Sequence, residues 1–590
     1  MNILVPVAAA ALVLWLALRL YPRWIGRVFH EDDANEVPAE KFADGCDFVK
    51  SRTHVVFGHH FATIAGAGPI VGPILALAFG WQPVWLWAVL GGIFFGAVHD
   101  MTVMFMSVRE GGRSVARIAK DVLGPVGYVL NLVVLIFVLT IVNAIFLNLS
   151  VTALTSAYPL DALGLEPGQR LLGAVEQNGV LMGRIGGIAT TSVFVITAFA
   201  PLLGWLIRSR GLGMSMAYAV AALVCVGSVV LGFLAPITLT GDTWRVLVTI
   251  YVFIACALPV WMVLQPRDFT NVQLLYGGMA LLLISLLVVG LFHGGSIQTP
   301  ALDLATGERV LNGAIWPILF ITVACGAISG FHSLVASGTT VKQLPRESDV
   351  RRIGYGGMIL ESFLAVLVLV AVASMLPQPE YLRIVYPAGA PSNPILAFAL
   401  GVGRMVHTAM PFVPVAIAAV LGILMIEGFV VTTLDSSVRL ARYLLDEFWD
   451  YVFAGATPAL LRHPMVNTAI AVGMMFFFAV SATVRQMWPI FGAGNQLIGA
   501  LALTTVTVWL VQRARRHLFA FLPAVCMIAT TLTALFLLLR HHLASGNLAL
   551  AVSAIVLLCL SVSVVVIGAT RFSQAVLRSK GTTGDVVANH

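Results

Sequence analysis

Charged residues are scarce in this sequence of 590 residues: only 10% are Asp, Glu, Lys or Arg, whereas 59% are hydrophobic. Soluble domains typically carry about 25% charged residues, which keep their surfaces hydrated. Together with a mean hydropathy of +0.95, this shortage excludes a soluble multidomain protein and is typical of an integral membrane protein.

Cysteine pairs, nucleotide-binding motifs and long polar segments are also missing. The six cysteines have no CxxC spacing and are Cys46, Cys225, Cys256, Cys325, Cys526 and Cys559, so we expect neither a disulfide framework nor a zinc site. Without a phosphate-binding loop of the GxxxxGK(S/T) type, ATP-driven pumping by this chain is unsupported. No loop is long enough for an independent catalytic domain, so we predict no enzyme activity, no resident cofactor and no metal site.

Apolar runs are what the sequence has in abundance. A helix needs roughly 17 to 25 predominantly apolar residues to cross a bilayer. We therefore predict an all-α polytopic membrane protein with about fifteen transmembrane helices, near 3–21, 55–80, 83–108, 126–153, 188–207, 214–234, 246–264, 276–293, 314–337, 357–377, 412–434, 465–484, 490–511, 519–540 and 548–568.

The basic residues predict the orientation of these spans. Because the first apolar run has no basic residue before it and Arg19 follows it, we expect a retained helix whose N-terminus lies outside. Fifteen spans then place the C-terminus in the cytosol, with 26 of the 34 Lys and Arg residues in predicted cytosolic segments and 8 on the other side. This bias follows the positive-inside rule. The net charge of +7 therefore indicates membrane orientation, and no nucleic-acid partner is expected.

Two of the predicted spans have interrupted backbones. The segment 57–73 contains four glycines and two prolines, and the segment 325–338 contains three glycines. Glycine frees the backbone and proline removes a hydrogen-bond donor, so helices of this composition should unwind locally. Irregular backbone at membrane depth survives where protein buries it or where it lines a watery cavity. The alternative is that these glycines only let helices pack closely.

The positions of the interruptions predict a repeat. Each begins a set of five spans, and the two sets have opposite orientations, which is the outline of a LeuT-like 5+5 inverted repeat. The predicted organisation is an N-terminal helix and cytosolic linker at 1–54, a first repeat at 55–234, two intervening helices at 235–313, a second repeat at 314–511, and two C-terminal helices with a cytosolic tail at 512–590. A segment near 391–407 is apolar but too short to cross, and we expect it to be re-entrant from outside.

Ionisable side chains within apolar spans are costly and are therefore candidates for function. They are His59 and His60 in the first interrupted span, His99 and Asp100 in the next, His332 in the second interrupted span, and Glu361 and Glu427. At about 1.5 Å per residue, Asp100 and Glu427 are predicted roughly 12 to 13 Å from the cytosolic ends of their helices. Glu361 is expected nearer the cytosolic surface, and no Lys or Arg is expected deep in a span.

We interpret Asp100 and Glu427 as proton carriers, because a buried carboxyl without a cationic neighbour favours its neutral form. The alternative is that these carboxyls only tie helices together. Thr432 and Thr433 have hydroxyls that suit a sodium site with carbonyls of a broken helix, although bonding back to their own helix is also open. The coupling ion is therefore a proton or sodium, and Asp435 with Arg439 is expected to be a surface ion pair.

The interruptions also predict where a substrate binds. Broken helices expose N–H groups and positive dipole ends that suit a carboxylate. The predicted substrate-binding residues are His59, His60, Phe61, Gly66, Ala67, Gly68, Ser329, Gly330, Phe331 and His332. For each histidine, a simple hydrogen bond to a neighbouring carbonyl is the alternative.

Several segments together resemble a known family. They are GHHFATIAGAGPIVGPILA (58–76), Asp100, SGFHSLVASGTT (329–340), TTLDSSVRLARYLLDE (432–447) and WPIFGAGNQLIGALAL (488–503). Over about 45–511 the chain resembles the carbon starvation protein A (CstA) family. The resemblance implies a LeuT-like fold of the amino acid-polyamine-cation transporter superfamily and uptake of pyruvate or peptides, with protons as the coupling ion.

We therefore predict a secondary active transporter of the bacterial inner membrane that imports a small carboxylate by proton symport and alternating access, with pyruvate favoured. Its expected partners are the lipid bilayer and a small-molecule substrate, and the oligomeric state is left open. Peptide uptake is the alternative, and a nutrient sensor without transport is a further one. A haem or metal oxidoreductase is disfavoured because the adjacent His59 and His60 point about 100° apart on a helix and cannot readily share one metal.

Overall fold

Helices occupy almost every apolar run of the sequence. The computed structural model describes residues 1–44, 48–169, 171–177, 179–259, 262–388 and 392–587. Cys46 and residue 391, where the predicted re-entrant segment begins, lie outside the described residues.

The chain folds into the following elements, of which η2 and η5 are π-helical and the other η elements are 3-10 helices. The helices up to residue 311 are α1 (Leu4–Phe29), α2 (Pro38–Lys41), α3 (Thr53–Ile64), α4 (Gly68–Ala76), η1 (Leu77–Phe79), α5 (Trp81–Leu86), η2 (Trp87–Gly96), α6 (Ala97–Arg109), α7 (Val115–Leu123), α8 (Pro125–Leu154), η3 (Asp161–Leu163), α9 (Gly186–Ser209), α10 (Met214–Leu234), α11 (Gly241–Ala257), α12 (Leu264–Phe292) and α13 (Leu304–Leu311). The later helices are α14 (Ile315–Thr322), α15 (Ala324–Ala327), α16 (Phe331–Gly338), η4 (Thr340–Gln343), η5 (Arg351–Tyr355), α17 (Gly356–Met375), α18 (Gln378–Val385), α19 (Pro394–Ala409), α20 (Val415–Val452), α21 (Ala459–Arg462), α22 (Pro464–Ser481), α23 (Val484–Gln512), α24 (Leu518–Ala544) and α25 (Leu548–Val587).

Twelve helices of the described chain are long and apolar enough to cross a membrane, and the bent pair α3–α4 would make thirteen. The predicted count of fifteen is therefore not confirmed. The two other predicted spans correspond to α11, which has 17 residues and includes Asp242 and Arg245, and to the interrupted helix α14–α16, whose pieces have eight, four and eight residues. In both places the apolar run is present, but no single long helix covers it.

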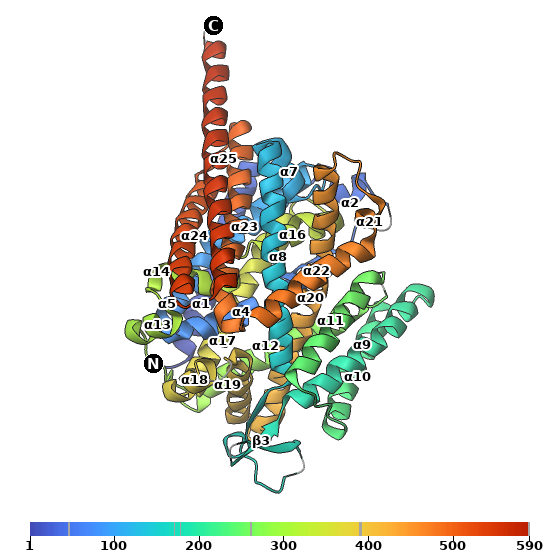
Figure 1. Cartoon of the computed structure of the whole chain (residues 1–590), viewed down its shortest axis with the longest axis vertical. Coiled ribbons are helices and arrows are strands. Elements are labelled where there is room, and N and C mark those ends of the chain that lie inside the picture. Colours follow the sequence, from blue (N-terminus) through green and yellow to red (C-terminus); the bar gives the residue numbers. More distant parts are fainter. Residues whose placement is uncertain (45–47, 170, 178, 260–261, 389–391, 588–590) are drawn as a thin grey trace.

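A small sheet at one end of the molecule was not predicted. Strands β1 (Ala157–Pro159), β2 (Ala174–Gln177) and β3 (Val180–Arg184) pair antiparallel in the order β1–β3–β2. Figure 1 shows this sheet at the bottom of the view, at the same end as α18 and α19. Apart from the sheet, the described elements are helical, so the all-α polytopic class is confirmed.

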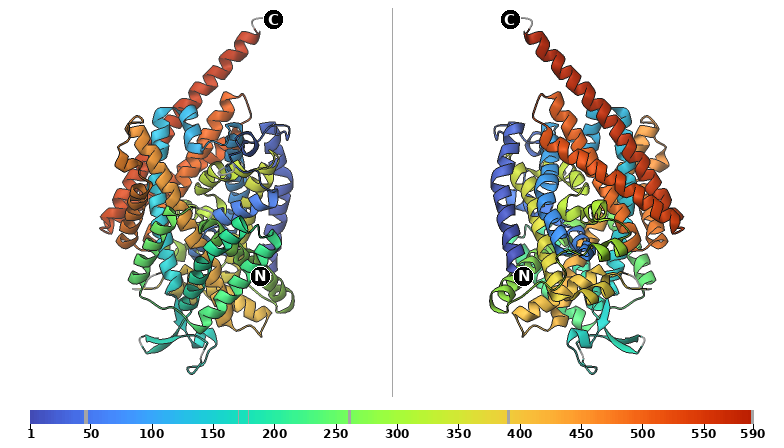
Figure 2. Two further views of the ribbon diagram at one scale, coloured as in Figure 1. Left: turned by 90° about the vertical axis from the view of Figure 1, so that its right-hand side faces the viewer. Right: turned by 90° about the vertical axis from the view of Figure 1, so that its left-hand side faces the viewer.

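The long helices α8 and α20 pack along each other in the middle of the molecule. The C-terminal helices α24 and α25 cover α23 on one side, and α9 and α10 form a hairpin at the opposite periphery (Figure 1). On α10, Leu223 and Val226 are 72% and 64% exposed, as expected of side chains that face lipid rather than protein. Figure 2 shows α25 extending well beyond the helical body at the end opposite the sheet.

Both predicted interruptions are present. Residues 65–67 separate α3 from α4, which are bent by 43° with respect to each other. Residues 328–330 separate α15 from α16, and Ile328 is in an extended conformation. The fold is therefore that of a polytopic α-helical membrane protein with a LeuT-like pair of discontinuous helices.

The proposed repeat boundaries stay a prediction, and the packing bears on them. Helix α12 contacts both α3 and α20, and α9 packs against α10 and also against α20 and α12. Helix α11 packs against α8 and α22. Helices α9, α11 and α12 thus all contact helices of the second set, and the boundaries 55–234 and 314–511 stay a prediction.

Candidate functional site

The two broken helices lie directly against each other. A Cβ atom placed on Gly68, the first residue of α4, would lie 2.3 Å from the Cβ atom of Cys325 on α15. One turn further along α4, a Cβ atom on Gly72 would lie 2.8 Å from the carbonyl oxygen of Thr322. Both glycines therefore allow a backbone approach that any larger residue would prevent.

Asn495 of α23 holds the second interruption in place. Its Oδ1 atom accepts a hydrogen bond of 3.0 Å from the backbone N–H of Phe331, the first residue of α16. Its Nδ2 atom donates to the Ser329 hydroxyl at 3.1 Å. The backbone approach is again close, because a Cβ atom on Gly330 would lie 2.2 Å from the Asn495 carbonyl oxygen. The side-chain amide thus pairs with a backbone N–H group in the first turn of α16, for which the helix itself offers no carbonyl acceptor.

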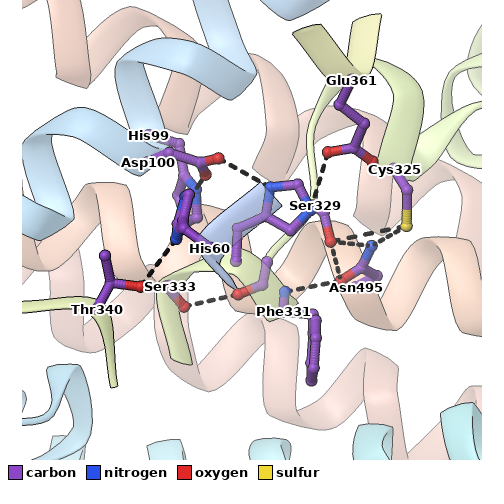
Figure 3. A network of polar contacts seen from close by, with 12 residues as sticks. His60, His99, Asp100, Cys325, Ser329, Phe331, Ser333, Thr340, Glu361 and Asn495 are labelled. Carbon is purple, nitrogen blue, oxygen red and sulfur yellow. Dashed lines mark hydrogen bonds and ion pairs between the residues drawn. The ribbon is translucent and has the colours of Figure 1, made fainter. Parts of the chain in front are cut away.

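A buried chain of histidines and carboxylates connects the second broken helix to its neighbours (Figure 3). His332 of α16 lies between two carboxylates: its Nδ1 atom is 2.8 Å from Oδ2 of Asp100, and its Nε2 atom is 3.3 Å from Oε2 of Glu361. His99 Nδ1 is 2.7 Å from the other oxygen of Asp100. All four side chains are completely buried. We call these four residues the histidine–carboxylate chain.

The histidines of the first broken helix have different surroundings. His60 is completely buried, and its Nδ1 atom is 2.8 Å from the Thr340 hydroxyl. Figure 3 places it beside Asp100. His59 is only half-buried, and its carbonyl accepts a hydrogen bond from the Thr63 hydroxyl. Phe61 stacks on Tyr276 of α12 with a centroid distance of 5.9 Å and an interplanar angle of 3°.

The predicted coupling threonines lie near the first interruption. A Cβ atom on Gly66 would be 3.1 Å from the Thr433 hydroxyl, which has no hydrogen-bond partner among the described residues. Thr432 instead accepts hydrogen bonds from Arg267 at 3.2 Å and from Asn271 at 3.4 Å, both on α12. The guanidinium group of Arg267 therefore lies beside the Thr432 hydroxyl, which is one of the two hydroxyls predicted to bind sodium.

Arg267 was not among the candidates, and it corrects one expectation. It is the fourth residue of α12 and only 1% exposed, so neighbouring helices bury a cation near the start of this span. Its Nη1 atom is 2.7 Å from Oδ2 of Asp435, and Tyr251 donates to the same oxygen at 2.8 Å. Asp435 is thus a buried partner of Arg267, and its predicted surface pairing with Arg439 is wrong, since Arg439 donates to backbone carbonyls of residues 255 and 258.

From the sequence we expected Glu427 deep in its span and Glu361 nearer the cytosolic surface. Glu427 of α20 is completely buried, as predicted, and neither of its oxygens has a hydrogen-bond partner within the described chain, although the Ser150 side chain lies near it. Glu361 was expected near the surface, but it is also completely buried. Its contact with His332 places it beside the second interruption, and its depth in the membrane stays a prediction.

The structure thus brings together most of the predicted site. Asp100, His332 and His60 gather between the two interruptions, and Gly68, Ser329, Gly330 and Phe331 form the contacts around them. Two residues that the sequence analysis did not select take part, Asn495 and Arg267. Glu361 takes part as well; it was a candidate ionisable residue but was not placed among the substrate-binding or coupling residues. Asn495 and Gln496 are adjacent amides in an apolar run, which is a usable signal.

Two cavities are described, and neither lies between the interruptions. One of about 410 Å³ lies between α11 and α22, and one of about 260 Å³ is lined by Trp87, Phe95, Trp316, Phe320 and Gln496 among others. Within the described ranges, no group of three or more His, Cys, Asp or Glu side chains is arranged to hold a metal ion. The two broken helices are closed against each other where Gly68 meets Cys325.

Comparison with known proteins decides the family. The model of the family described as "Carbon starvation protein CstA" matches residues 2–391 and 388–534. The chain belongs to the carbon starvation protein CstA family. It is 31% identical to "Peptide transporter CstA" of Bacillus subtilis (strain 168), over 92% of this chain and 91% of the relative. It is 29% identical to "Pyruvate/proton symporter BtsT" of Escherichia coli (strain K12), over 90% of this chain and 80% of the relative.

Solved structures of transporters also align with this CstA-family chain. MhsT in complex with L-phenylalanine aligns with 87% of the chain and 98% of its own length, at 12% identity and a TM-score of 0.45. Through its family, the protein is a multi-pass membrane transporter and not an enzyme.

Proposed function

We propose that this CstA-family transporter imports a small carboxylate, with pyruvate as the favoured substrate, by proton symport and alternating access in the bacterial inner membrane. One observation carries the proposal: a buried histidine–carboxylate chain lies at the junction of two broken helices. Ionisable groups at membrane depth are expensive and mark proton or substrate paths. A relative that is 29% identical is named a pyruvate/proton symporter.

The substrate is proposed to bind between the interruptions, at the residues predicted from the sequence. Because Gly68 is pressed against Cys325 in the closed arrangement, the two broken helices must separate before a substrate can enter. The N-terminus of α16 is occupied by the amide of Asn495. The substrate carboxylate is therefore proposed to take the N-terminus of α4, which begins at Gly68, together with His60 and His332.

The surroundings of Thr432 favour a proton over sodium as the coupling ion. Sodium would have to bind beside the guanidinium of Arg267, which donates to the Thr432 hydroxyl at 3.2 Å. Carboxylate oxygens of Asp435 and Asp268 lie 2.7 and 3.8 Å from nitrogens of this guanidinium and balance its charge. Sodium is disfavoured here because two hydrogen-bond donors, Arg267 and Asn271, already use the Thr432 oxygen. The N-terminus is proposed to lie outside and the C-terminus in the cytosol, following the distribution of Lys and Arg.

Peptide uptake is the second candidate function. It is favoured by relatives that are named peptide transporters, including the one from Bacillus subtilis of which the chain covers 91%. Both candidates share a carboxylate at one end of the substrate, so the proposed contacts at the interruptions serve either. They differ in the space required beyond that carboxylate.

The test is uptake of labelled pyruvate and of a labelled alanyl dipeptide into proteoliposomes that contain the purified full chain. A pH gradient, a sodium gradient or neither is imposed. We expect accumulation of pyruvate with the pH gradient alone, and its loss in Asp100→Asn and Glu427→Gln. The control is Asp242→Asn, since Asp242 has a 92% exposed side chain at the start of α11.

Other outcomes select other functions. Dipeptide accumulation without pyruvate accumulation would make the protein a peptide transporter. Accumulation that follows only the sodium gradient would overturn proton coupling. Binding of either compound without any flux would support a nutrient sensor and reject transport.

A further inference from the structure

Glu361 differs in its environment from Asp100, the other carboxylate of the histidine–carboxylate chain. It shares its lack of hydrogen-bond partners with Glu427, which lies near Ser150 rather than beside His332. Glu361 is completely buried on α17, and neither oxygen has a hydrogen-bond partner within the described residues. Its close polar contact is with His332, whose Nε2 atom lies 3.3 Å away without hydrogen-bond geometry. Buried polar groups are nearly always hydrogen-bonded, so an exception requires an explanation. An ionised carboxylate in this position would be poorly stabilised.

Asp100, at the other end of the same imidazole, has the opposite environment. Both of its oxygens are engaged, one by His99 at 2.7 Å and the other by His332 at 2.8 Å. Two hydrogen bonds from imidazole nitrogens stabilise the ionised form of a carboxylate. The surroundings of Asp100 therefore favour its ionised form, whereas those of Glu361 allow it to gain and lose a proton.

The other ionisable groups near Glu361 support these different roles of Asp100 and Glu361. The titratable groups that act on Glu361 are His332 on α16, Asp100 on α6 and Cys325 on α15. His60 of α3 lies against Gly357, one turn earlier on α17, and His99 reaches the group only through Asp100. No Lys or Arg forms an ion pair with Glu361 anywhere in the described chain. Its charge can therefore be balanced by His332 or by a proton.

We propose that Glu361 is the residue that carries the transported proton, and that His332 transmits its charge to the substrate site at the second interruption. This inference rests on the proposed proton-coupled uptake of a carboxylate. The proton moves from water to a carboxylate oxygen of Glu361 on the loading side, and from that oxygen back to water on the other side. No other covalent bond forms or breaks.

The coupling to the substrate is electrostatic. With Glu361 protonated, a charged His332 and an ionised Asp100 balance each other, and the histidine–carboxylate chain is neutral. When Glu361 loses its proton, two anions flank one imidazolium, and the resulting negative charge repels a substrate carboxylate in a site of low dielectric. The anionic substrate therefore binds when Glu361 is loaded, which is what a proton symporter requires.

The test separates exchange of substrate from its accumulation. Glu361→Gln mimics the loaded, neutral state, so proteoliposomes with this variant should still exchange external labelled pyruvate for internal unlabelled pyruvate. The exchange rate should no longer depend on pH, and accumulation driven by a pH gradient should fall to the level seen without a gradient. Glu308→Gln is the matched control, because Glu308 is exposed on α13, and it should behave as the wild type.

Glu361→Asp keeps a titratable group and guards against a folding defect of the glutamine variant. It should retain accumulation, with a shifted pH midpoint of exchange. Gradient-driven accumulation by Glu361→Gln, loss of exchange in a folded Glu361→Gln variant, or an unshifted midpoint in Glu361→Asp would each overturn the proposal. If the wild type itself shows no accumulation with a pH gradient, the proposed function fails, which is a distinct result.

Discussion

Gly68 of α4 lies against Cys325 of α15 so closely that a Cβ atom on Gly68 would be 2.3 Å from the Cβ atom of Cys325 and 2.4 Å from its sulfur. This is the point at which the two discontinuous helices meet. The glycine-rich stretch around residue 68 therefore has two functions. It interrupts the first helix, and it removes the side chain that would keep the second helix away.

Gly68→Ala should separate the two broken helices. We expect a loss of stability of about 1 to 3 kcal/mol from overpacking, and a reduced rate of transport because the closed arrangement becomes harder to reach. Uptake at matched protein levels and thermal unfolding in detergent measure the two effects. Gly338→Ala is the control, because a Cβ atom on Gly338 of α16 would meet nothing within 4 Å. Cys325→Gly should partly restore Gly68→Ala, and wild-type behaviour of Gly68→Ala alone would contradict the proposed contact.

Arg267→Ala should destabilise the protein strongly. It leaves Asp435 as a buried carboxylate without its cationic partner, and the loss of one member of a buried pair costs about 3 to 5 kcal/mol. Arg113→Ala is the matched control, because its ion pair with Asp121 joins side chains that are 41% and 56% exposed and should contribute less than about 1 kcal/mol.

A second substitution at the partner tests the same pair. Thermal unfolding of Arg267→Ala, Asp435→Asn and the double variant gives a coupling free energy. If Arg267 acts mainly by balancing Asp435, the double variant should be more stable than Arg267→Ala. Additive effects of the two substitutions would count against this account.

The sequence predicted the interruptions well because they depend on local chemistry. Glycine and proline within an apolar run are sufficient to predict a broken helix, and both breaks are present. The packing of the hairpin α9–α10 at the edge of the molecule was not predictable, since hydropathy identifies spans but does not say which spans touch.

The candidate site was predicted in part for the same reason. Asp100 and His332 were selected as ionisable residues in apolar runs, and they contact each other. Arg267 was missed because the span was expected to begin at residue 276, whereas α12 begins at Leu264. An arginine can enter the buried part of a helix when carboxylates from other helices pair with it, and no feature of the sequence near residue 267 indicates that Asp435 is close.

The segment at the sheet end of the molecule should loosen in acid. Glu380 of α18 accepts two hydrogen bonds of 2.7 Å from Arg404 of α19 and one of 2.6 Å from Tyr158 of β1. Burial alone would raise the pKa of Glu380, but these hydrogen bonds lower the pKa below its ordinary value of 4.5. Burial and the hydrogen bond to Glu380 raise the pKa of Tyr158 to about 12, so its hydroxyl stays a donor at neutral pH.

A carboxylate with a lowered pKa in the folded state stabilises that state above its unfolded pKa, and this contribution disappears as the pH falls through the folded value. The wild type should therefore unfold at a higher temperature than Glu380→Gln at neutral pH. The difference should begin to shrink as the pH falls below 4.5 and should vanish below the lowered pKa of Glu380. Unfolding curves over a pH series, with the exposed Glu308→Gln as control, measure this. A difference that persists in acid would mean that the hydrogen bonds to Glu380 do not have the expected effect.

Asn495→Ala should impair transport more than its cost in stability alone would explain. The substitution leaves the N–H group of Phe331 and the hydroxyl of Ser329 without their amide partner, and an unsatisfied buried group costs about 1 to 3 kcal/mol. It also frees the N-terminus of α16, so the closed position of the second broken helix is no longer fixed.

A second asparagine that caps a helix tests whether any lost cap lowers transport, or only the cap at the second interruption. Asn547 accepts a hydrogen bond of 3.2 Å from the N–H group of Leu550 at the start of α25 and is partly exposed. Asn547→Ala should therefore lower stability by about 1 kcal/mol, as caps do, without changing the uptake rate per folded molecule. Asn495→Ala should lower that rate as well, and Asn495→Asp, which keeps the acceptor for Phe331, should retain more transport than Asn495→Ala. Equal uptake by all three variants would show that the hydrogen bonds from Asn495 of α23 to the second interruption do not control the transport cycle.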